Sequence, residues 1–244
     1  MHEETFKTRY HEMNPQGKIP VWVLQNYFQE AAGIDAHNLS YGWEELSANG
    51  VAWILTKVQI KLLKPVSGAQ KIKVKTWHCY SDKIQSRRDF ILFNENGEHI
   101  AKGVSWWLIM DLSKRKITRS PQSLIDLNDK NPAPIMEASM EKAPRENELG
   151  REINSFDVIA RLEDLDSNNH VNNSHFSAWA VQSAPQEVSD AKNLEEIIIH
   201  YKAEVRLGDK LTVSAHEAGQ NAFWHIIKRP ADGREIAAIY TKWG

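Results

Sequence analysis

The chain has 244 residues, of which 41% are hydrophobic and 25% charged, and this ordinary globular composition excludes a disordered or fibrous protein. Its 30 Lys and Arg residues nearly balance its 32 Asp and Glu residues, so no overall basic charge indicates a nucleic-acid-binding protein. The single cysteine, Cys79, excludes an internal disulfide and a zinc site built from several cysteines, and it is typical of a reducing compartment.

The start of the sequence, Met-His-Glu-Glu-Thr, is acidic and lacks the apolar stretch of a secretory signal. No run elsewhere approaches the roughly 18 apolar residues that a membrane-spanning helix needs. We therefore expect a cytoplasmic protein without a membrane span.

A helix followed by alternating apolar stretches makes up the first half. Proline is tolerated in the first turn of a helix and glycine often ends one, so the apolar spacing between Pro20 and Gly33 predicts a helix over 20–33. Alternation predicts strands over 52–63, 71–77, 89–93 and 100–110. Asn96-Gly97 precedes the last of these strands and predicts a tight hairpin in which both residues can take positive φ.

The second half repeats this order. Asn173 can cap a helix that carries Phe176 and Trp179, and strands are predicted over 195–206, 210–217, 222–228 and 235–242. Residues 96–101, Asn-Gly-Glu-His-Ile-Ala, are similar to residues 232–237, Asp-Gly-Arg-Glu-Ile-Ala. The alternative is a coincidence of periodicity, but the shared order favours two duplicated halves.

A linker is predicted over 126–150, where Pro132, Pro134 and Pro144 stand among charged and small residues without periodicity. We expect an α+β fold made of two repeats, 1–125 and 151–244, in each of which an antiparallel sheet wraps its own helix.

A dense polar cluster, Asp-Leu-Asp-Ser-Asn-Asn-His-Val-Asn-Asn, occupies 164–173 directly before the second helix. On an extended segment Asp166, Asn168 and His170 can project together, and the helix N-terminus can supply N–H donors to an oxyanion. An Asx-rich turn that caps the helix is the alternative, but it gives no reason for His170.

Other chemistries are less well supported by the sequence. Glycines spaced for phosphate binding are missing, and Ser105 in Gly103-Val-Ser105 lacks the second glycine of a nucleophile elbow. His170 and His175 are five residues apart across a helix start, which is poor spacing for a metal site. We expect neither a metal nor a cofactor.

The cluster 164–173 closely resembles the signature of the acyl-acyl carrier protein thioesterases of plastids and bacteria. Trp179, Lys202-Ala-Glu204, Arg87-Arg-Asp89 and Val104-Ser-Trp-Trp107 extend the resemblance over nearly the whole chain. It implies a tandem double hotdog, in which two helix-wrapped sheets form a pseudo-dimer, with the acyl chain bound by 1–125 and the chemistry in 151–244.

The resemblance also implies four catalytic residues: Asp166, Asn168, His170 and Glu204. Pattern alone would put Glu204 on the charged, solvated face of a strand. Plant members often carry a cysteine directly after this glutamate, whereas this chain has Val205, so catalysis by a thiol is doubtful.

Substrate-binding residues are expected in the first half, where Met13 to Lys18 aligns with Leu165 to His170 but lacks its acid and imidazole. Aromatic residues of the first helix, Trp22, Tyr27 and Phe28, can wall an acyl tunnel, although core packing is the ordinary explanation. Because the carrier proteins of this class are acidic, a basic docking surface is expected, with Arg87, Arg88, Lys114, Arg115 and Lys116 as candidates.

The function implied by the resemblance is hydrolysis of acyl-acyl carrier protein to a free fatty acid in fatty acid biosynthesis, without a cofactor. Two alternatives stay open: an acyl-coenzyme A thioesterase on the same fold, and a non-catalytic acyl-chain or acyl-carrier binding protein. Acyl length, saturation and further homodimerisation are not determined by the sequence.

Overall fold

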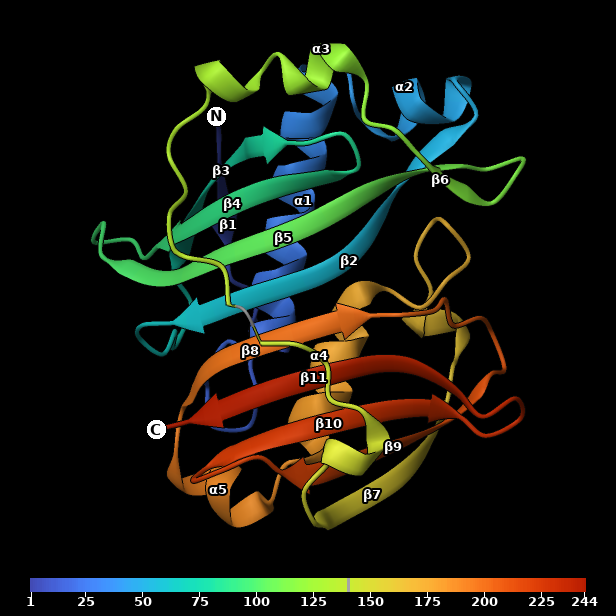
Figure 1. Ribbon diagram of the computed structural model, residues 1–244. Coiled ribbons are helices and arrows are strands. Elements are labelled where there is room, and N and C mark those ends of the chain that lie inside the picture. Colours follow the sequence, from blue (N-terminus) through green and yellow to red (C-terminus); the bar gives the residue numbers. More distant parts are fainter. Residues whose placement is uncertain (140) are drawn as a thin grey trace. The chain divides into compact units, whose positions relative to one another are not determined.

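The computed structural model describes residues 1–139 and 141–244 and divides into two compact units, Met1–Ala138 and Ser139–Gly244. Each unit consists of one long helix and an antiparallel sheet (Figure 1). In the described residues, no helix is long and apolar enough to cross a membrane.

In unit 1, an antiparallel sheet of five successive strands wraps around helix α1, Val21–Asn38. The strand order is β1-β3-β4-β5-β2, and β6 pairs with β5. The strands are β1 His2–Lys7, β2 Val51–Leu62, β3 Lys71–Ser81, β4 Gln85–Phe93, β5 His99–Asp111 and β6 Lys116–Thr118. Shorter helical segments are Tyr10–Glu12 (η1), α2 Trp43–Ala48, α3 Gln122–Ile125 and Asn128–Lys130 (η2).

Aromatic packing joins α1 to its sheet. The Phe28 ring stacks on Phe90 of β4 with 4.4 Å between ring centroids. A Cβ on Gly103 of β5 would lie 2.6 Å from the Phe28 ring, so glycine at this position allows the helix to approach the strand closely. Tyr27 stacks on Phe6 of β1, with 4.6 Å between centroids. The apolar face of α1 is therefore packed against the sheet of its own unit, with β1, β3, β4 and β5 in contact with it.

Helix α1 is longer than the predicted 20–33, because it continues through Gly33 to Asn38. Glycine inside a helix costs about 1 kcal/mol relative to alanine. The turns beyond it bring Asp35 into the interior, where its carboxylate accepts a 2.6 Å hydrogen bond from the Arg88 guanidinium of β4. Loss of these turns would leave the Arg88 guanidinium as an uncompensated buried charge, which is strongly unfavourable and explains why the helix continues past Gly33.

Unit 2 has the same design with the strand order β8-β11-β10-β9-β7 around helix α4, Asn173–Ser183. Its strands are β7 Glu152–Ile159, β8 Leu194–Tyr201, β9 Lys210–Glu217, β10 Ala222–Arg229 and β11 Arg234–Trp243. Shorter helical segments are Glu146–Glu148 (η3), Leu162–Asp164 (η4) and α5 Gln186–Ala191.

The two faces of the unit 2 sheet are packed differently. His225 of β10 is fully buried on the side of α4, where Ser183 Oγ is 2.7 Å from its Nδ1 and Thr241 Oγ1 is 2.8 Å from its Nε2. On the other face Trp224, Ile226 and Ala238 form a cluster. Ala143 and Leu149 pack against that cluster, so the segment before β7 covers the outer face of the sheet.

The structure confirms an α+β fold made of two repeats, but each repeat begins with a strand, β1 or β7, and not with its helix. The strand predicted over 195–206 is wrong in its second half, because β8 ends at Tyr201. Beyond it the N–H groups of Lys202 and Ala203 both point to the Ile236 carbonyl, at 2.9 and 3.2 Å, and this shared acceptor breaks the regular ladder. Strands β1, β6 and β7 were not predicted from the sequence.

The predicted hairpin at 96–97 is present between β4 and β5. Gly97 takes φ 78°, and Asn94 closes the turn by accepting the N–H groups of Asn96 and Glu98 on its side-chain oxygen at 3.1 and 2.9 Å. Asn96 is not among the residues of positive φ, so the expectation that both residues have positive φ is wrong for Asn96.

Candidate active site

The polar segment before α4 forms a tight turn. Asp166 Oδ1 accepts the Asn168 N–H at 2.8 Å, the Asp166 N–H donates to the His170 carbonyl at 2.9 Å, and Asn169 takes φ 57°. Leu165 and Val171 then form an isolated bridge that closes the turn. The Asx turn considered as the alternative is thus present, and it holds His170 at the end of the turn.

The turn brings His170 to Glu204, 34 positions further along the chain. His170 Nε2 lies 3.2 Å from Glu204 Oε2, and their side chains are 28% and 32% exposed. An imidazole and a carboxylate in contact, both partly open to solvent, can share a proton and take one from a water molecule. Among the four residues of the predicted set, Asn168 is exposed at the tip of the turn.

Glu204 lies in a loop and not on a strand, so the charged strand face inferred from its pattern is wrong. The Val171 N–H donates to the Val205 carbonyl at 2.9 Å, which sets the two segments beside each other. Arg229 of β10 donates to the Glu204 carbonyl at 2.7 Å, and Arg206 lies 3.5 Å from the Glu204 carboxylate. The hydrogen bond from Arg229 could not be predicted from the sequence, since Arg229 lies 25 positions after Glu204.

Asn172, and not the predicted Asn173, caps helix α4. Its side-chain oxygen accepts the Ser174 N–H at 2.9 Å and the Ser174 hydroxyl at 2.9 Å. The Ser174 N–H is therefore already bonded and not free to serve an oxyanion. His175 in the first turn lies 3.3 Å from Asp164, a different carboxylate from the one that faces His170.

The same turn occurs in unit 1 with different side chains. Asn14 accepts the Lys18 N–H on its side chain at 2.9 Å, the Asn14 N–H donates to the Lys18 carbonyl at 2.9 Å, and Gly17 takes φ 70°. The Ile19 N–H donates to the Val66 carbonyl at 2.8 Å, as Val171 does to Val205. By this equivalence Lys18 stands at the position of His170, and Pro65 at the position of Glu204.

Two candidate docking residues, Arg87 and Arg88, are not on the surface. Their exposures are 6% and 8%, and both guanidinium groups are bound to buried carboxylates, Arg87 to Asp89 at 2.6 Å and Arg88 to Asp35 at 2.6 Å. The prediction that they dock a carrier protein is wrong, because a side chain held inside the unit cannot contact a partner. Lys114, Arg115 and Lys116 are exposed around the turn into β6.

The aromatic candidates on α1 differ in burial. Tyr27 and Phe28 are 6% and 3% exposed, and the Tyr27 hydroxyl donates to Glu12 at 2.7 Å, while Trp22 is partly exposed. Their contacts are those of core packing, and their role toward an acyl chain stays a prediction.

Cys79 is buried in β3, with its Sγ 4.0 Å from the Pro132 carbonyl. Burial, followed by the nearby Asp89, raises the pKa of the Cys79 thiol to about 11. The thiolate that nucleophilic catalysis requires is therefore disfavoured.

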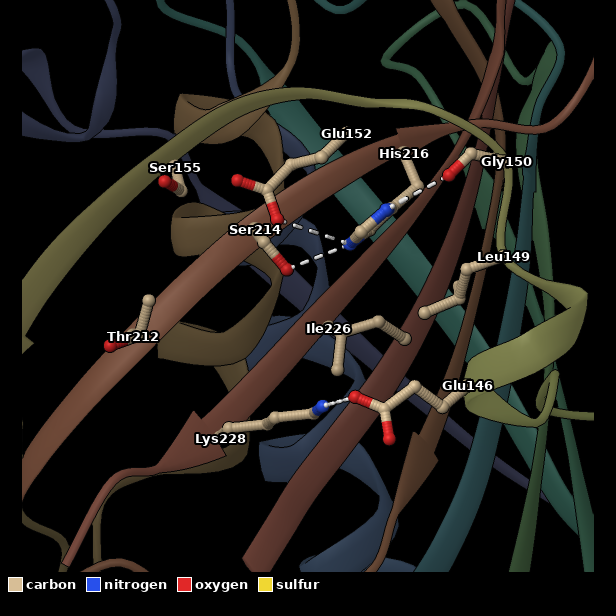
Figure 2. Close-up of a pocket in the computed structure, with 10 residues that line it drawn as sticks. All are labelled: Glu146, Leu149, Gly150, Glu152, Ser155, Thr212, Ser214, His216, Ile226 and Lys228. Carbon is tan, nitrogen blue, oxygen red and sulfur yellow. Dashed lines mark hydrogen bonds and ion pairs between the residues drawn. The ribbon is translucent and has the colours of Figure 1, made fainter. Parts of the chain in front are cut away.

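A second polar cluster lines a cavity of about 420 Å³ on the outer face of the unit 2 sheet (Figure 2). His216 Nε2 is 2.9 Å from Ser214 Oγ and 3.9 Å from a Glu152 oxygen, while His216 Nδ1 is 3.2 Å from the Gly150 carbonyl. A Ser-His-acid triad needs the acid on the nitrogen opposite the serine. Here both groups face the same nitrogen, so the cluster lacks triad geometry and ties the segment before β7 to the sheet.

Family models and relatives agree on one family of proteins. The model of the acyl-ACP thioesterase N-terminal domain matches residues 1–127, and that of the acyl-ACP thioesterase C-terminal domain matches residues 147–244. The chain is 26% identical to the chloroplastic acyl-[acyl-carrier-protein] hydrolase FATB2 of Cuphea viscosissima and 24% identical to the chloroplastic palmitoyl-acyl carrier protein thioesterase of Gossypium hirsutum, over 98% of this chain in each case. It spans 62% and 63% of the lengths of these two relatives.

Two solved structures share the fold over nearly the whole chain. The acyl-ACP thioesterase of Bacteroides thetaiotaomicron superposes with a TM-score of 0.86 at 23% identity, covering 99% of this chain and 97% of that one. The 12:0-ACP thioesterase of Umbellularia californica superposes with a TM-score of 0.85 at 18% identity, covering 99% and 96%. These likenesses confirm the double-hotdog fold expected from the sequence.

Proposed function

We propose that this chain, which belongs to the acyl-ACP thioesterase family, hydrolyses the thioester of an acyl-acyl carrier protein and releases a free fatty acid. The observation that carries the proposal is the contact between His170 and Glu204, 3.2 Å apart at a partly exposed site. The equivalent positions in the other repeat hold a lysine and a proline, which cannot form this pair.

The reaction needs few parts, because a thioester carbonyl is already electrophilic. A water molecule held by the pair His170 and Glu204 attacks the carbonyl carbon and gives its proton to the pair. The carbon–sulfur bond then breaks, the electrons leave with the pantetheine sulfur, and the pair returns the proton to this thiolate. Because His170 Nε2 and Glu204 Oε2 are 3.2 Å apart, the two side chains can hold the transferred proton between them.

The other two residues of the predicted set support this pair. Asp166 is bonded to the Asn168 N–H at 2.8 Å and therefore shapes the turn that carries His170. In this scheme Asp166 orients its neighbours, and Asn168, exposed at the turn, polarises the substrate carbonyl through its side-chain amide. No residue in the scheme requires a metal or an organic cofactor.

Substitutions at the pair test the catalytic assignment. His170→Ala and Glu204→Gln should each lower kcat for an acyl-carrier thioester at least about a hundredfold, because each removes a group that acts in the chemical step. Asn168→Ala should follow the same direction. The matched control is Glu163→Gln, an exposed carboxylate in the preceding segment, which should keep the rate of the unmodified protein.

Circular dichroism should show that all four variants are folded. Near-normal turnover in His170→Ala, Glu204→Gln and Asn168→Ala together would refute the site. Hydrolysis of acyl-coenzyme A in preference to the carrier thioester would favour the coenzyme A alternative, and no hydrolysis of either would favour a binding protein.

Location and assembly are also part of the proposal. We infer the cytoplasm from the lone cysteine, whereas the names of the plant relatives place those proteins in the chloroplast. Homodimerisation is a prediction that light scattering of the purified protein can check.

A further inference from the structure

The two repeats carry opposite charge on the edge that holds the duplicated turn. Backbone pairing shows which positions of the two edges are equivalent. Lys7 pairs with Lys71 in unit 1, as Ile159 pairs with Lys210 in unit 2. The N–H groups of Leu63 and Lys64 both donate to the Ile100 carbonyl, as those of Lys202 and Ala203 both donate to the Ile236 carbonyl. Segments 7–18 and 64–71 of unit 1 therefore correspond to segments 159–170 and 203–210 of unit 2.

In unit 1 these segments carry five cationic side chains and a single carboxylate, a net charge of +4 with histidines neutral. We call this surface the basic edge; its cations are Lys7, Arg9, Lys18, Lys64 and Lys71. The equivalent segments of unit 2 carry three cations and five carboxylates, a net charge of −2. The equivalent segments of the two repeats thus differ by six charges.

The lone carboxylate of the basic edge, Glu12, is turned inward. Its side chain is 13% exposed, lies 3.7 Å from the Arg9 guanidinium, and accepts hydrogen bonds from the Arg9 N–H and the Tyr27 hydroxyl, both at 2.7 Å. Glu12 therefore does little to cancel the positive charge presented to solvent. Among the cations, Lys64 pairs with an exposed carboxylate outside the two segments, that of Glu98 at 2.6 Å. Tyr10, next to Arg9 in the sequence, is 93% exposed and offers an aromatic surface to a partner.

Lys7 and Lys71 are direct partners across the β1–β3 ladder, and both are exposed. Like charges directly opposite each other destabilise a pair of strands. Unit 2 avoids this conflict, because Ile159 stands opposite Lys210. An anionic partner bound here would relieve the repulsion in unit 1.

We propose that the basic edge of unit 1 is the docking surface for the acidic acyl carrier protein. The inference rests on the proposed function, which supplies this partner. Electrostatic complementarity mainly raises the rate of encounter and orients the partner. The equivalent segments of unit 2 carry a net negative charge and lack this complementarity, so they are the less favourable surface for binding the folded carrier.

Single charge reversals provide the test. Lys7→Glu and Lys71→Glu each replace the opposed lysines with a Glu–Lys pair, so the strands should pair at least as well as before. Each variant should lower kcat/KM for the acyl-carrier thioester about three- to tenfold at low ionic strength, with a smaller effect at high ionic strength. Hydrolysis of the matched acyl-pantetheine thioester, which is uncharged, should not change.

Lys210→Glu is the matched control, because it makes the same charge change at the equivalent position of unit 2. It should not weaken the use of the carrier substrate. An equal loss with carrier and pantetheine substrates would overturn the proposal, and so would an effect of Lys210→Glu as large as that of Lys71→Glu. Loss on Lys116→Glu with none on Lys7→Glu or Lys71→Glu would place docking at the β6 turn and overturn the basic edge.

Binding separates this proposal from the proposed function. Fluorescence anisotropy of labelled acyl carrier protein on the His170→Ala variant measures docking without turnover. Weaker binding with Lys7→Glu, but not with Lys210→Glu, would support the basic edge even if the unmodified protein hydrolysed no thioester. Binding unaffected by Lys7→Glu and Lys71→Glu would overturn the edge while leaving hydrolysis intact.

Discussion

Single buried histidines determine how this fold should respond to acid. His225 is fully buried between two hydroxyl groups, and burial lowers its pKa to about 3. His78 of β3 is 4% exposed, and burial followed by the charge of Arg88 lowers its pKa to about 4. Both side chains are therefore neutral in the folded protein at pH values where an unfolded chain would already bind protons.

The free energy of unfolding should fall as the pH drops below about 6.5, the ordinary histidine pKa, toward the lowered values. Above that pH both histidines are neutral in the folded and in the unfolded protein, so they do not contribute to the pH dependence of the free energy of unfolding. Each histidine should add about 1.4 kcal/mol of lost stability per pH unit in this window. Urea denaturation at pH 7 and pH 5 measures the slope.

His225→Gln should be less stable at pH 7 and should show a shallower dependence on pH. His11→Gln, a substitution at an exposed histidine of unit 1, is the control and should keep the slope of the unmodified protein. An unchanged slope in His225→Gln would show that His225 is not held neutral in the folded state.

At the scale of elements, the loop after β8 depends on one arginine. Arg229 is 20% exposed, donates to the Glu204 carbonyl at 2.7 Å, and lies 3.4 Å from the carboxylates of both Asp209 and Asp232. It does not touch the reacting atoms of the proposed scheme. We therefore regard Arg229 as a positioning residue, which holds the Glu204 backbone where its side chain can face His170.

Arg229→Gln should lower kcat about tenfold and leave KM nearly unchanged, because small displacements of a catalytic group are costly even when the substrate still binds. Arg229→Lys should restore part of the rate through its charge near Asp209 and Asp232. Arg234→Gln, an exposed arginine at the start of β11, is the control. A fall in stability with no change in kcat would mean that Arg229 is only structural.

The sequence predicts those elements whose signal is local. Helix α1, the β4–β5 hairpin and strands β9 to β11 follow from spacing and turn residues, and all are present. Strand β7 was missed because its exposed positions, such as Glu152 and Asn154, read as loop, although pairing with β9 makes the segment a strand. Tertiary pairing decides such segments.

The candidate site divides in the same way. The turn around Asp166 and the cap at Asn172 are local and could be predicted within one residue. The contact between His170 and Glu204 depends on the bridge from Val171 to Val205, and only a resemblance to a known family could suggest it from the sequence. The burial of Arg87 and Arg88 was missed, because a basic dipeptide gives no sign of the buried carboxylates that bind it.

At the scale of the whole molecule, duplication allows the two repeats to specialise. Unit 2 keeps the imidazole and carboxylate, while the equivalent turn of unit 1 holds Lys18 and Pro65. Helix α1 has 18 residues against 11 in α4, and it buries a longer apolar face. That face ends at the buried ion pair of Asp35 and Arg88, which an apolar acyl chain could not displace without a large cost.

Acyl-chain preference should therefore follow unit 1. Exchanging residues 21–53 with those of a family member of different preference should shift the ratio of kcat/KM values between two chain lengths toward the donor. Each methylene in an apolar pocket is worth about 1–3 kcal/mol, so the shift should exceed tenfold for a difference of two carbons. Hydrolysis should persist, because His170 and Glu204 lie outside the exchanged segment. The reciprocal control exchanges residues 173–191, which include α4, and should leave the preference unchanged; selectivity that followed this second exchange would assign acyl binding to unit 2.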